Sequence, residues 1–146
     1  MKDILLEIIA AKRIAVEHFC RAVLESICFQ MTDLLRAMTK DSNIILSELR
    51  VDGGASVSNI MMQIQADLIR TVVNRPKTVE TTALGAAYLA GLCVGMWKTP
   101  EEIEKNREVE RVFIPKMDKK VRDKLCEDWK RAVERSRNWA QEDDFD

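Results

Sequence analysis

The segment Leu49-Arg50-Val51-Asp52-Gly53-Gly54-Ala55-Ser56-Val57-Ser58-Asn59 carries the strongest fold signal in this 146-residue chain. A short β-prone run leads into two glycines and then into the start of a helix, an order typical of α/β proteins. Ligands of parallel sheets bind beyond the carboxyl ends of the strands. Glycines at such a place let a ligand approach the backbone without meeting a Cβ, and the N–H groups of the following helix suit a phosphate.

The same glycines allow a second interpretation, in which they serve only the backbone angles of a tight strand-to-helix turn. The chain has neither GxGxxG nor GxxxxGK[ST], so the two common nucleotide fingerprints are absent. Ser56, Ser58 and Asn59 add side chains that can form hydrogen bonds. The residues alone leave ligand binding and a purely structural turn both open.

Hydrophobic periodicity places helices and strands on both sides of this segment. Before it, apolar residues recur at helical spacing along one face between Glu17 and Met38. After it, helical and β-prone segments alternate, which predicts two parallel strands joined by a crossover helix. The predicted elements are a helix at 17–38, a strand in 44–51 centred on 49–51, a helix from Ser56 or Ser58 to Ile69, a strand at 71–73 closed by a turn at 74–76, a helix from Thr81 or Thr82 to Trp97, and a helix at 119–140.

Small residues recur every four positions in the predicted helix that begins near Thr81 or Thr82, at Ala83, Ala87, Gly91 and Gly95. We expect this stripe to pack closely against another element. A membrane-spanning dimer helix is disfavoured, because 83–97 is shorter than the roughly 20 residues that a bilayer requires. The polar residues at the helix entrance, Glu80, Thr81 and Thr82, are expected to face the same cleft as Gly53 and Gly54.

Composition excludes several classes of protein. The chain has 23 Lys and Arg against 24 Asp and Glu, a balance that disfavours a general nucleic-acid binder. Hydrophobic residues make up 47%, too many for a disordered chain. The four cysteines show no CxxC pair and no metal-ligand spacing, which predicts buried, reduced thiols. No signal peptide or membrane span is recognisable, so we expect a cytoplasmic location.

Four runs and a tail pattern resemble the C-terminal domain of the FGGY carbohydrate kinases, in particular of its glycerol kinases. The runs are RAVLESICFQ at 21–30, LRVDGGA at 49–55, MQIQAD at 62–67 and TALGAAYLAG at 82–91, and the tail pattern is WKRAV at 129–133. The resemblance covers about 17–140. It implies an α/β fold that is a partial actin-like, ribonuclease-H-type ATPase domain, helix-rich and without the antiparallel strands that begin such a domain.

The resemblance also implies the site and its ligands. Gly54, with Gly53 beside it, matches the family's contact to the nucleotide phosphates. Ser58 occupies a position on the adenine side where the family often has Asn, and Asn59 lies next to it. ATP and Mg are the implied cofactors. The resemblance places the glycerol-binding residues and the aspartate general base in an N-terminal domain, so we expect neither catalytic residues nor metal ligands in this chain.

These implications divide the chain into a helical leader outside the family pattern at 1–16, a nucleotide-binding core at 17–100 and a charged helical extension at 101–146. The first functional hypothesis is the C-terminal part of a glycerol kinase, which phosphorylates glycerol to sn-glycerol 3-phosphate with ATP. The isolated chain is expected to be inactive and marginally folded, because two strands rarely form a stable sheet. The alternative is a non-catalytic, kinase-derived binding module that forms a homo-oligomer or docks on an intact kinase.

Overall fold

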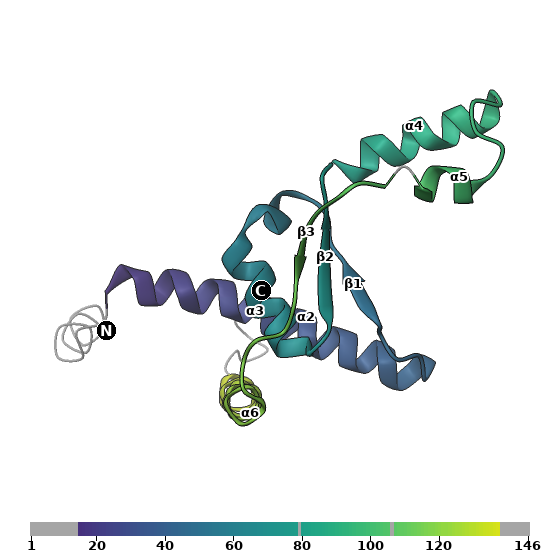
Figure 1. Ribbon diagram of the computed structural model, residues 1–146. Helices are drawn as coiled ribbons and strands as arrows, with labels where there is room; N and C mark the ends of the chain where they lie inside the picture. Colours follow the sequence, from purple (N-terminus) through teal and green to yellow (C-terminus); the bar gives the residue numbers. More distant parts are fainter. Residues whose placement is uncertain (1–14, 79, 106, 138–146) are drawn as a thin grey trace, which may run out of the picture.

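The computed structural model describes residues 15–78, 80–105 and 107–137. Figure 1 shows a central sheet with helices α2, α3 and α6 around its lower part, while α4 and α5 project away from it. The elements are α2 (Val16–Ser42), β1 (Glu48–Arg50), the 3-10 helix η1 (Gly54–Val57), α3 (Asn59–Ile69), β2 (Val72–Pro76), α4 (Thr81–Cys93), α5 (Pro100–Lys105), β3 (Val109–Phe113) and α6 (Lys119–Ser136).

The sheet has the strand order β1-β2-β3. β1 and β2 are parallel, with Leu49 opposite Val73, and α3 forms the crossover between them, as the sequence predicts. β3 was not predicted, and it pairs antiparallel with β2 so that Phe113 lies opposite Val73. The prediction that the second strand ends at Val73 is therefore wrong. β2 continues to Pro76, because β3 supplies partners along its whole length.

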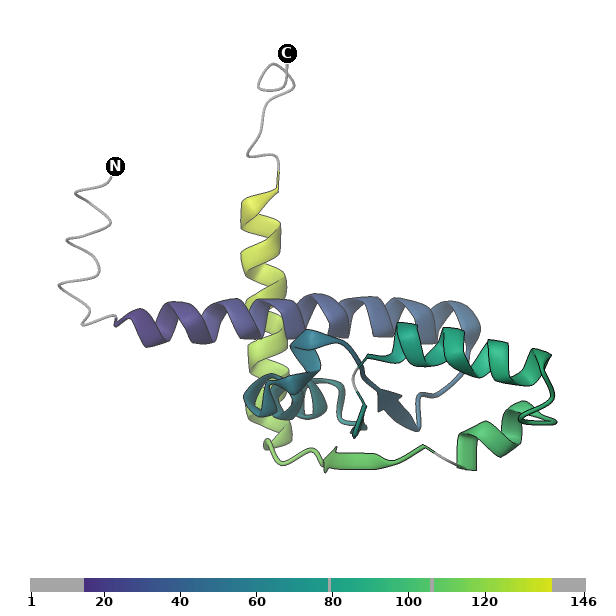
Figure 2. The same ribbon diagram turned by 90° about the horizontal axis from the view of Figure 1, so that it is seen from above.

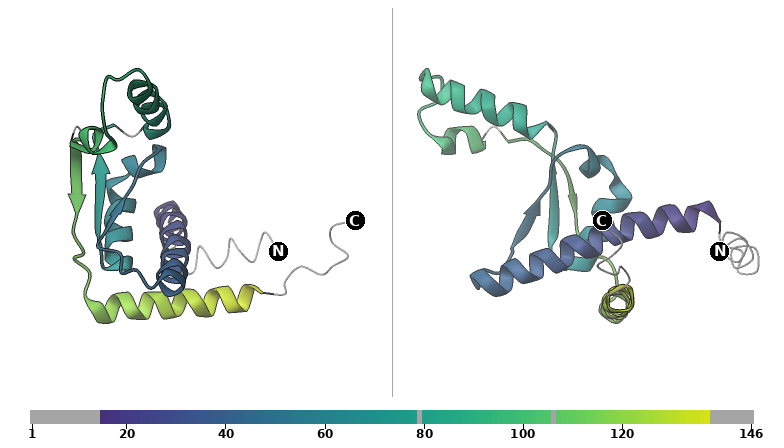
Figure 3. Two further views of the ribbon diagram at one scale, coloured as in Figure 1. Left: turned by 90° about the vertical axis from the view of Figure 1, so that its right-hand side faces the viewer. Right: turned by 180° about the vertical axis from the view of Figure 1, so that it is seen from behind.

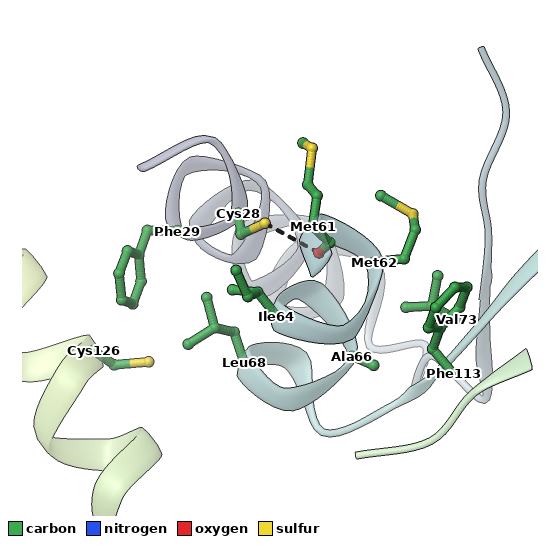
Figure 4. Packing of buried hydrophobic residues seen from close by; sticks show 10 residues of the cluster. All are labelled: Cys28, Phe29, Met61, Met62, Ile64, Ala66, Leu68, Val73, Phe113 and Cys126. Atoms are coloured by element: carbon green, nitrogen blue, oxygen red, sulfur yellow. Dashed lines mark hydrogen bonds between the residues drawn. The ribbon is translucent and has the colours of Figure 1, made fainter. Parts of the chain in front are cut away.

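The packing has three layers, visible in the left view of Figure 3, where α3 lies between the sheet and α2. Residues of α3 contribute half of the buried apolar core. Figure 4 shows Ile64 and Leu68 pointing from α3 toward Phe29 and Cys126, while Val73 and Phe113 lie on the sheet side. The core consists of Cys28, Phe29, Met61, Met62, Ile64, Ala66, Leu68, Val73, Phe113 and Cys126.

The predicted helix at 17–38 is confirmed as the longer α2, but its apolar face does not form the core. The buried residues of α2 are Cys28 and Thr32, which contact α3, and Phe29, which stacks on Trp129 of α6. Most of the apolar stripe lies on the other side, where Phe19, Val23 and others are exposed. The helix is thus covered on one side, while its most hydrophobic side faces solvent.

α4 ends at Cys93, four residues before the predicted end, and its small-residue stripe is not packed as expected. Ala83 and Ala87 are exposed. Gly91 alone of the four is covered, since a Cβ there would lie 2.2 Å from a ring carbon of Trp97. Gly95 follows the helix with φ of 80°. α4 begins at Thr81, as predicted, and its N-cap is Glu80, which forms no side-chain cap.

α6 confirms the predicted last helix from Lys119 to Ser136; Arg137 is already its extended C-cap, and 138–140 lie outside the described residues. Figure 2 shows α6 crossing α2. The Trp129 ring stacks on Phe29 with centroids 5.3 Å apart, and its indole N–H donates to Asp33 at 2.8 Å. The charged extension is therefore anchored to the same core as α2.

The expectation for the cysteines was partly correct, whereas the expected leader stays untested. Cys28 and Cys126 are buried, free thiols, but Cys20 and Cys93 are exposed, so the prediction of burial is wrong for that pair. The predicted leader at 1–16 lies almost entirely outside the described residues. Among the helices that the structure describes, none is both long and apolar enough to cross a membrane.

Candidate nucleotide-binding turn

The Asp52–Ser58 turn begins where β1 leaves the sheet. The Val51 N–H donates to the carbonyl of Asn74 at 3.2 Å, which is the last backbone bond to β2 before the chain turns away. Gly53 then adopts φ 76° and ψ 174°, a region that is open essentially only to glycine. The backbone angles of the tight turn are therefore sufficient to explain why residue 53 is a glycine.

Gly54 is different, because nothing among the described residues requires a glycine there. Its φ is not in the left-handed range, and a Cβ built on it would meet no heavy atom within 4 Å. Neither backbone strain nor packing accounts for the residue. The remaining reason for a glycine is that it lets a ligand reach the main chain without meeting a side chain. This favours the ligand-binding interpretation at Gly54.

The two serines of the turn bond to the turn itself. Ser56 is buried, and its hydroxyl donates to the carbonyl of Gly53 at 2.7 Å. Ser58 is the N-cap of α3, where its Oγ accepts from the Met61 N–H at 3.3 Å. Both side chains therefore hold the turn in place, and the position on the adenine side that the resemblance assigns to Ser58 coincides with a helix cap.

Arg75 of β2 is a functional candidate that sequence reasoning missed. Its side chain is only 5% exposed and forms a bidentate pair with Glu110 of β3, at 2.6 and 3.1 Å. Its remaining donors reach the carbonyls of Ser56 at 2.7 Å and Val57 at 3.0 Å, and the Oδ1 of Asn59 at 2.8 Å. One buried guanidinium therefore joins the turn, the start of α3 and two strands.

The bond to Arg75 also orients Asn59. Since the Oδ1 of Asn59 accepts from Arg75, its amide NH₂ group is directed away from the guanidinium. Asn59 is exposed, so this amide is accessible at the end of the turn. The four sequence-predicted residues Gly53, Gly54, Ser58 and Asn59 thus lie within one turn, with Gly54 and Asn59 presenting its accessible groups.

The start of α4 contacts the same turn. The Thr81 hydroxyl donates to the carboxylate of Asp52, which agrees with the expectation that the entrance of this helix faces the glycines. Thr81 also lines a hollow of about 760 Å³ between α4, α5 and the end of β2, together with Lys77, Tyr88 and Arg107. In the described part of the chain, no three His, Cys, Asp or Glu side chains gather closely enough to hold a metal ion.

A parallel strand pair joined by a crossover helix, with a glycine turn at the carboxyl end of its first strand, places the chain among α/β domains whose ligands bind at that end. Comparison with known proteins identifies the family. Residues 3–93 match the model of the FGGY family of carbohydrate kinases, C-terminal domain. The chain therefore belongs to the FGGY family of carbohydrate kinases. The match begins within 1–16, whose assignment as a separate leader stays a prediction.

Individual relatives show which members of this family the chain resembles. The chain is 56% identical over 126 residues to a glycerol kinase of Caldanaerobacter subterraneus subsp. tengcongensis, an alignment that covers 86% of this chain and 25% of that kinase. A glycerol kinase of Alkaliphilus oremlandii is 53% identical over 130 residues, which is 89% of this chain and 26% of the kinase. The chain thus spans about a quarter of the length of these relatives.

Solved structures confirm the fold class. The crystal structure of Plasmodium falciparum glycerol kinase with ADP superimposes with a TM-score of 0.74 at 40% identity, covering 85% of this chain and 24% of the other. A gluconate kinase from Lactobacillus acidophilus superimposes with a TM-score of 0.68 at 22% identity, covering 81% and 24%, which supports the fold alone. The helix-rich chain with its small mixed sheet is thus part of the kinases' actin-like ATPase fold, as the sequence predicts.

Proposed function

We propose that this chain provides part of the ATP site of a glycerol kinase, which as a whole phosphorylates glycerol to sn-glycerol 3-phosphate. The observation that carries the proposal is the open approach to Gly54 at the carboxyl end of β1. Identity of 56% to a glycerol kinase supports glycerol rather than another acceptor. ATP is a cytoplasmic substrate, so we place this function in the cytoplasm.

Each predicted site residue has a role in this proposal. Gly53 bends the chain, and Gly54 leaves room for phosphate oxygens to reach the main chain. Ser58 caps α3, and the Asn59 amide, oriented by Arg75, donates toward the adenine side. The chain's own residues therefore bind and orient the nucleotide, and none of them acts on the transferred phosphoryl group.

Mg²⁺ is proposed to arrive with the nucleotide. Mg²⁺ in kinases is held by one or two carboxylates together with the phosphates of the substrate. The carboxylate of Asp52 accepts from Thr81 beside the turn, and we expect the protein ligands of Mg²⁺ to lie in the remainder of the kinase. Phosphoryl transfer depends on holding nucleotide, metal and acceptor together, and this chain spans only about a quarter of such kinases. We therefore expect it to be inactive alone.

A second candidate function is a non-catalytic binding module derived from a kinase. The outward-facing apolar residues of α2 favour it, because such a surface suits a protein partner. Part of an ATP site must bind ADP, whereas a module that acts only through a protein partner need not bind it. The affinity of the chain for ADP therefore distinguishes the two candidates.

Calorimetric titration of the full 146-residue chain with MgADP tests the proposal. Gly54→Val places a branched side chain in the open space above the turn, and we expect at least tenfold weaker binding. Ala132→Val adds the same kind of bulk on the exposed surface of α6 and serves as the matched control. Equal ADP affinity in Gly54→Val and the unaltered chain would contradict the proposal, as would a folded chain that binds no ADP.

A further inference from the structure

The bond between Arg75 and Asn59 decides which part of the Asn59 amide meets a ligand. A carboxamide carries two donors and an acceptor, and by rotating it can present either kind of group. Here the Nη2 of Arg75 donates to the Oδ1 of Asn59 at 2.8 Å. A guanidinium has donors only, so a rotated Asn59 would bring donors against donors. Asn59 therefore directs its NH₂ group, a donor, toward whatever binds beside it.

Arg75 is in turn held in one orientation by Glu110 of β3. The carboxylate of Glu110 accepts from the Nε of Arg75 at 2.6 Å and from its Nη2 at 3.1 Å. A bidentate pair of this kind fixes the plane of the guanidinium, which also lies 5.3 Å from the centroid of the Phe113 ring. The orientation of the Asn59 amide thus depends on a carboxylate that does not itself touch Asn59.

Asn59 borders a hollow with room for a heterocyclic base. Its volume is about 440 Å³, within the range of about 300–1,000 Å³ that is typical of small-molecule pockets. Ile60 and Arg111 line the same hollow. Ile60 is 58% exposed and offers an apolar surface. The guanidinium of Arg111, 5.1 Å from the centroid of the Phe113 ring, is a planar cation on which bases stack well.

We propose that Glu110, acting through Arg75, makes Asn59 the residue that selects adenine over guanine. This inference rests on the proposed function, which places the adenine side of the nucleotide at the end of the turn. Enzymes that read a base do so by hydrogen bonds to its Watson–Crick edge. On that edge, N1 of adenine is an acceptor, whereas N1 of guanine carries a hydrogen and is a donor. An outward NH₂ group therefore pairs with adenine and opposes guanine.

The three residues have different roles in this selection. Asn59 contacts the base and is a binding residue, whereas Arg75 and Glu110 act through it and are positioning residues. A site built to pair with a polar group rejects an analogue that cannot pair, because its own group is left unsatisfied. Since Asn59 is exposed in this chain, we expect a moderate preference, with ADP bound about tenfold more tightly than GDP.

Calorimetric titration of the full 146-residue chain with MgADP and with MgGDP measures this preference as the ratio of the two dissociation constants. Asn59→Asp replaces the outward NH₂ group by an oxygen of similar size, which accepts from N1 of guanine. The added charge weakens both nucleotides alike, so the ratio reports on the base. We expect Asn59→Asp to bind GDP more tightly than ADP. Asn43→Asp, at the exposed C-cap of α2, adds the same charge and should keep the original ratio.

Glu110→Gln tests the positioning role. Glutamine retains the length of the side chain, but its neutral amide cannot offer two anionic oxygens to the guanidinium, so Arg75 is no longer fixed as a fork. We expect the preference for ADP to fall to about threefold or less. If Glu110 served stability alone, both nucleotides would bind more weakly and their ratio would stay unchanged. Glu108→Gln, which removes the exposed ion pair with Lys77, is the matched control.

The possible outcomes separate this inference from the proposed function. Equal affinity of the unaltered chain for ADP and GDP would overturn the inference and leave the proposed function standing, as would an unchanged ratio in Asn59→Asp or in a folded Glu110→Gln chain. A folded chain that binds neither nucleotide would overturn both. Circular dichroism establishes that each variant is folded. Because Asn59 is exposed, Asn59→Asp decides the matter even if Glu110→Gln fails to fold.

Discussion

Gly53 and Gly54 are adjacent, yet they are glycines for different reasons. Gly53 needs its positive φ, whereas Gly54 has ordinary backbone angles and open space where a Cβ would lie. The sequence pattern DGG could not separate these reasons, because both residues satisfy it equally. Stability and ligand affinity are therefore expected to respond to different members of the pair.

The first prediction compares alanine substitutions at these two positions. Gly53→Ala should lower the free energy of unfolding by about 1–3 kcal/mol, because alanine is strained in this backbone region. Gly54→Ala should change it by less than about 0.5 kcal/mol. Urea denaturation followed by circular dichroism measures both. Equal losses of stability in the two variants would show that Gly54, too, is a structural glycine.

The second prediction concerns Arg75, whose fork geometry lysine cannot reproduce. Arg75→Lys loses the bidentate bond to Glu110 and the bonds to the turn. We expect it to lower the free energy of unfolding by about 2–3 kcal/mol and to weaken ADP binding as well. Arg135→Lys on the exposed surface of α6 is the control. An Arg75→Lys chain with unchanged stability and unchanged ADP affinity would remove Arg75 from the site.

At the scale of elements, local pattern was sufficient for α2, α3 and α6, where helical periodicity is strong. It was not sufficient for β3, because Val109-Glu110-Arg111-Val112-Phe113 buries only Phe113 and shows no clean alternation. Its strand conformation depends on pairing with β2, 33 to 40 residues earlier in the sequence. Missing β3 also hid Arg75, since the residue then fell in a predicted turn instead of a central strand.

The orientation of α2 was equally inaccessible from its sequence. Periodicity identifies an apolar face, but it cannot say whether this chain or another polypeptide covers that face. The side that is buried against α3 and α6 contains Cys28, Phe29 and Thr32, and it has fewer large apolar residues than the exposed side with Phe19, Val23 and Leu34. Thr32 is accepted there because its hydroxyl donates to the carbonyl of Cys28 at 2.7 Å and accepts from Gln65 at 3.2 Å.

The third prediction uses Cys28, at the contact between α2 and α3. Burial, with a smaller effect of Glu25, raises the pKa of this thiol from 9.0 to about 11. Between pH 9 and 11 the unfolded chain loses this proton while the folded chain keeps it, so the thiol's contribution to stability falls as pH rises. The stability difference between the unaltered chain and Cys28→Ala should shift in this direction when both are measured at pH 8 and pH 10.5.

Alkylation by iodoacetamide provides an independent measurement of the same thiol. Cys20 and Cys93 are exposed and should react rapidly, whereas Cys28 should react slowly because its thiolate is scarce and covered. Mass spectrometry of peptides after short exposure gives the rate at each site. Reaction of Cys28 as fast as that of Cys20 would mean that the α2–α3 contact opens readily.

In the molecule as a whole, a small buried core contrasts with a large exposed apolar surface. Within the residues that the structure describes, the core holds ten buried hydrophobic residues and 19 large hydrophobic residues are exposed, among them seven of α2. The near-neutral composition gave no sign of this, because charge totals do not record where apolar residues lie. Three strands make a sheet more stable than the two that were predicted, but among the described strands both β1 and β3 are edges, and one face of α2 is exposed.

The fourth prediction follows from this balance and concerns activity. The 146-residue chain alone should convert no glycerol with MgATP above the background of a sample without protein, since it spans only a quarter of its kinase relatives. Conversion of glycerol is measured as ADP formed in a coupled spectrophotometric assay. Turnover by the isolated chain would mean that the described turn belongs to a complete active site.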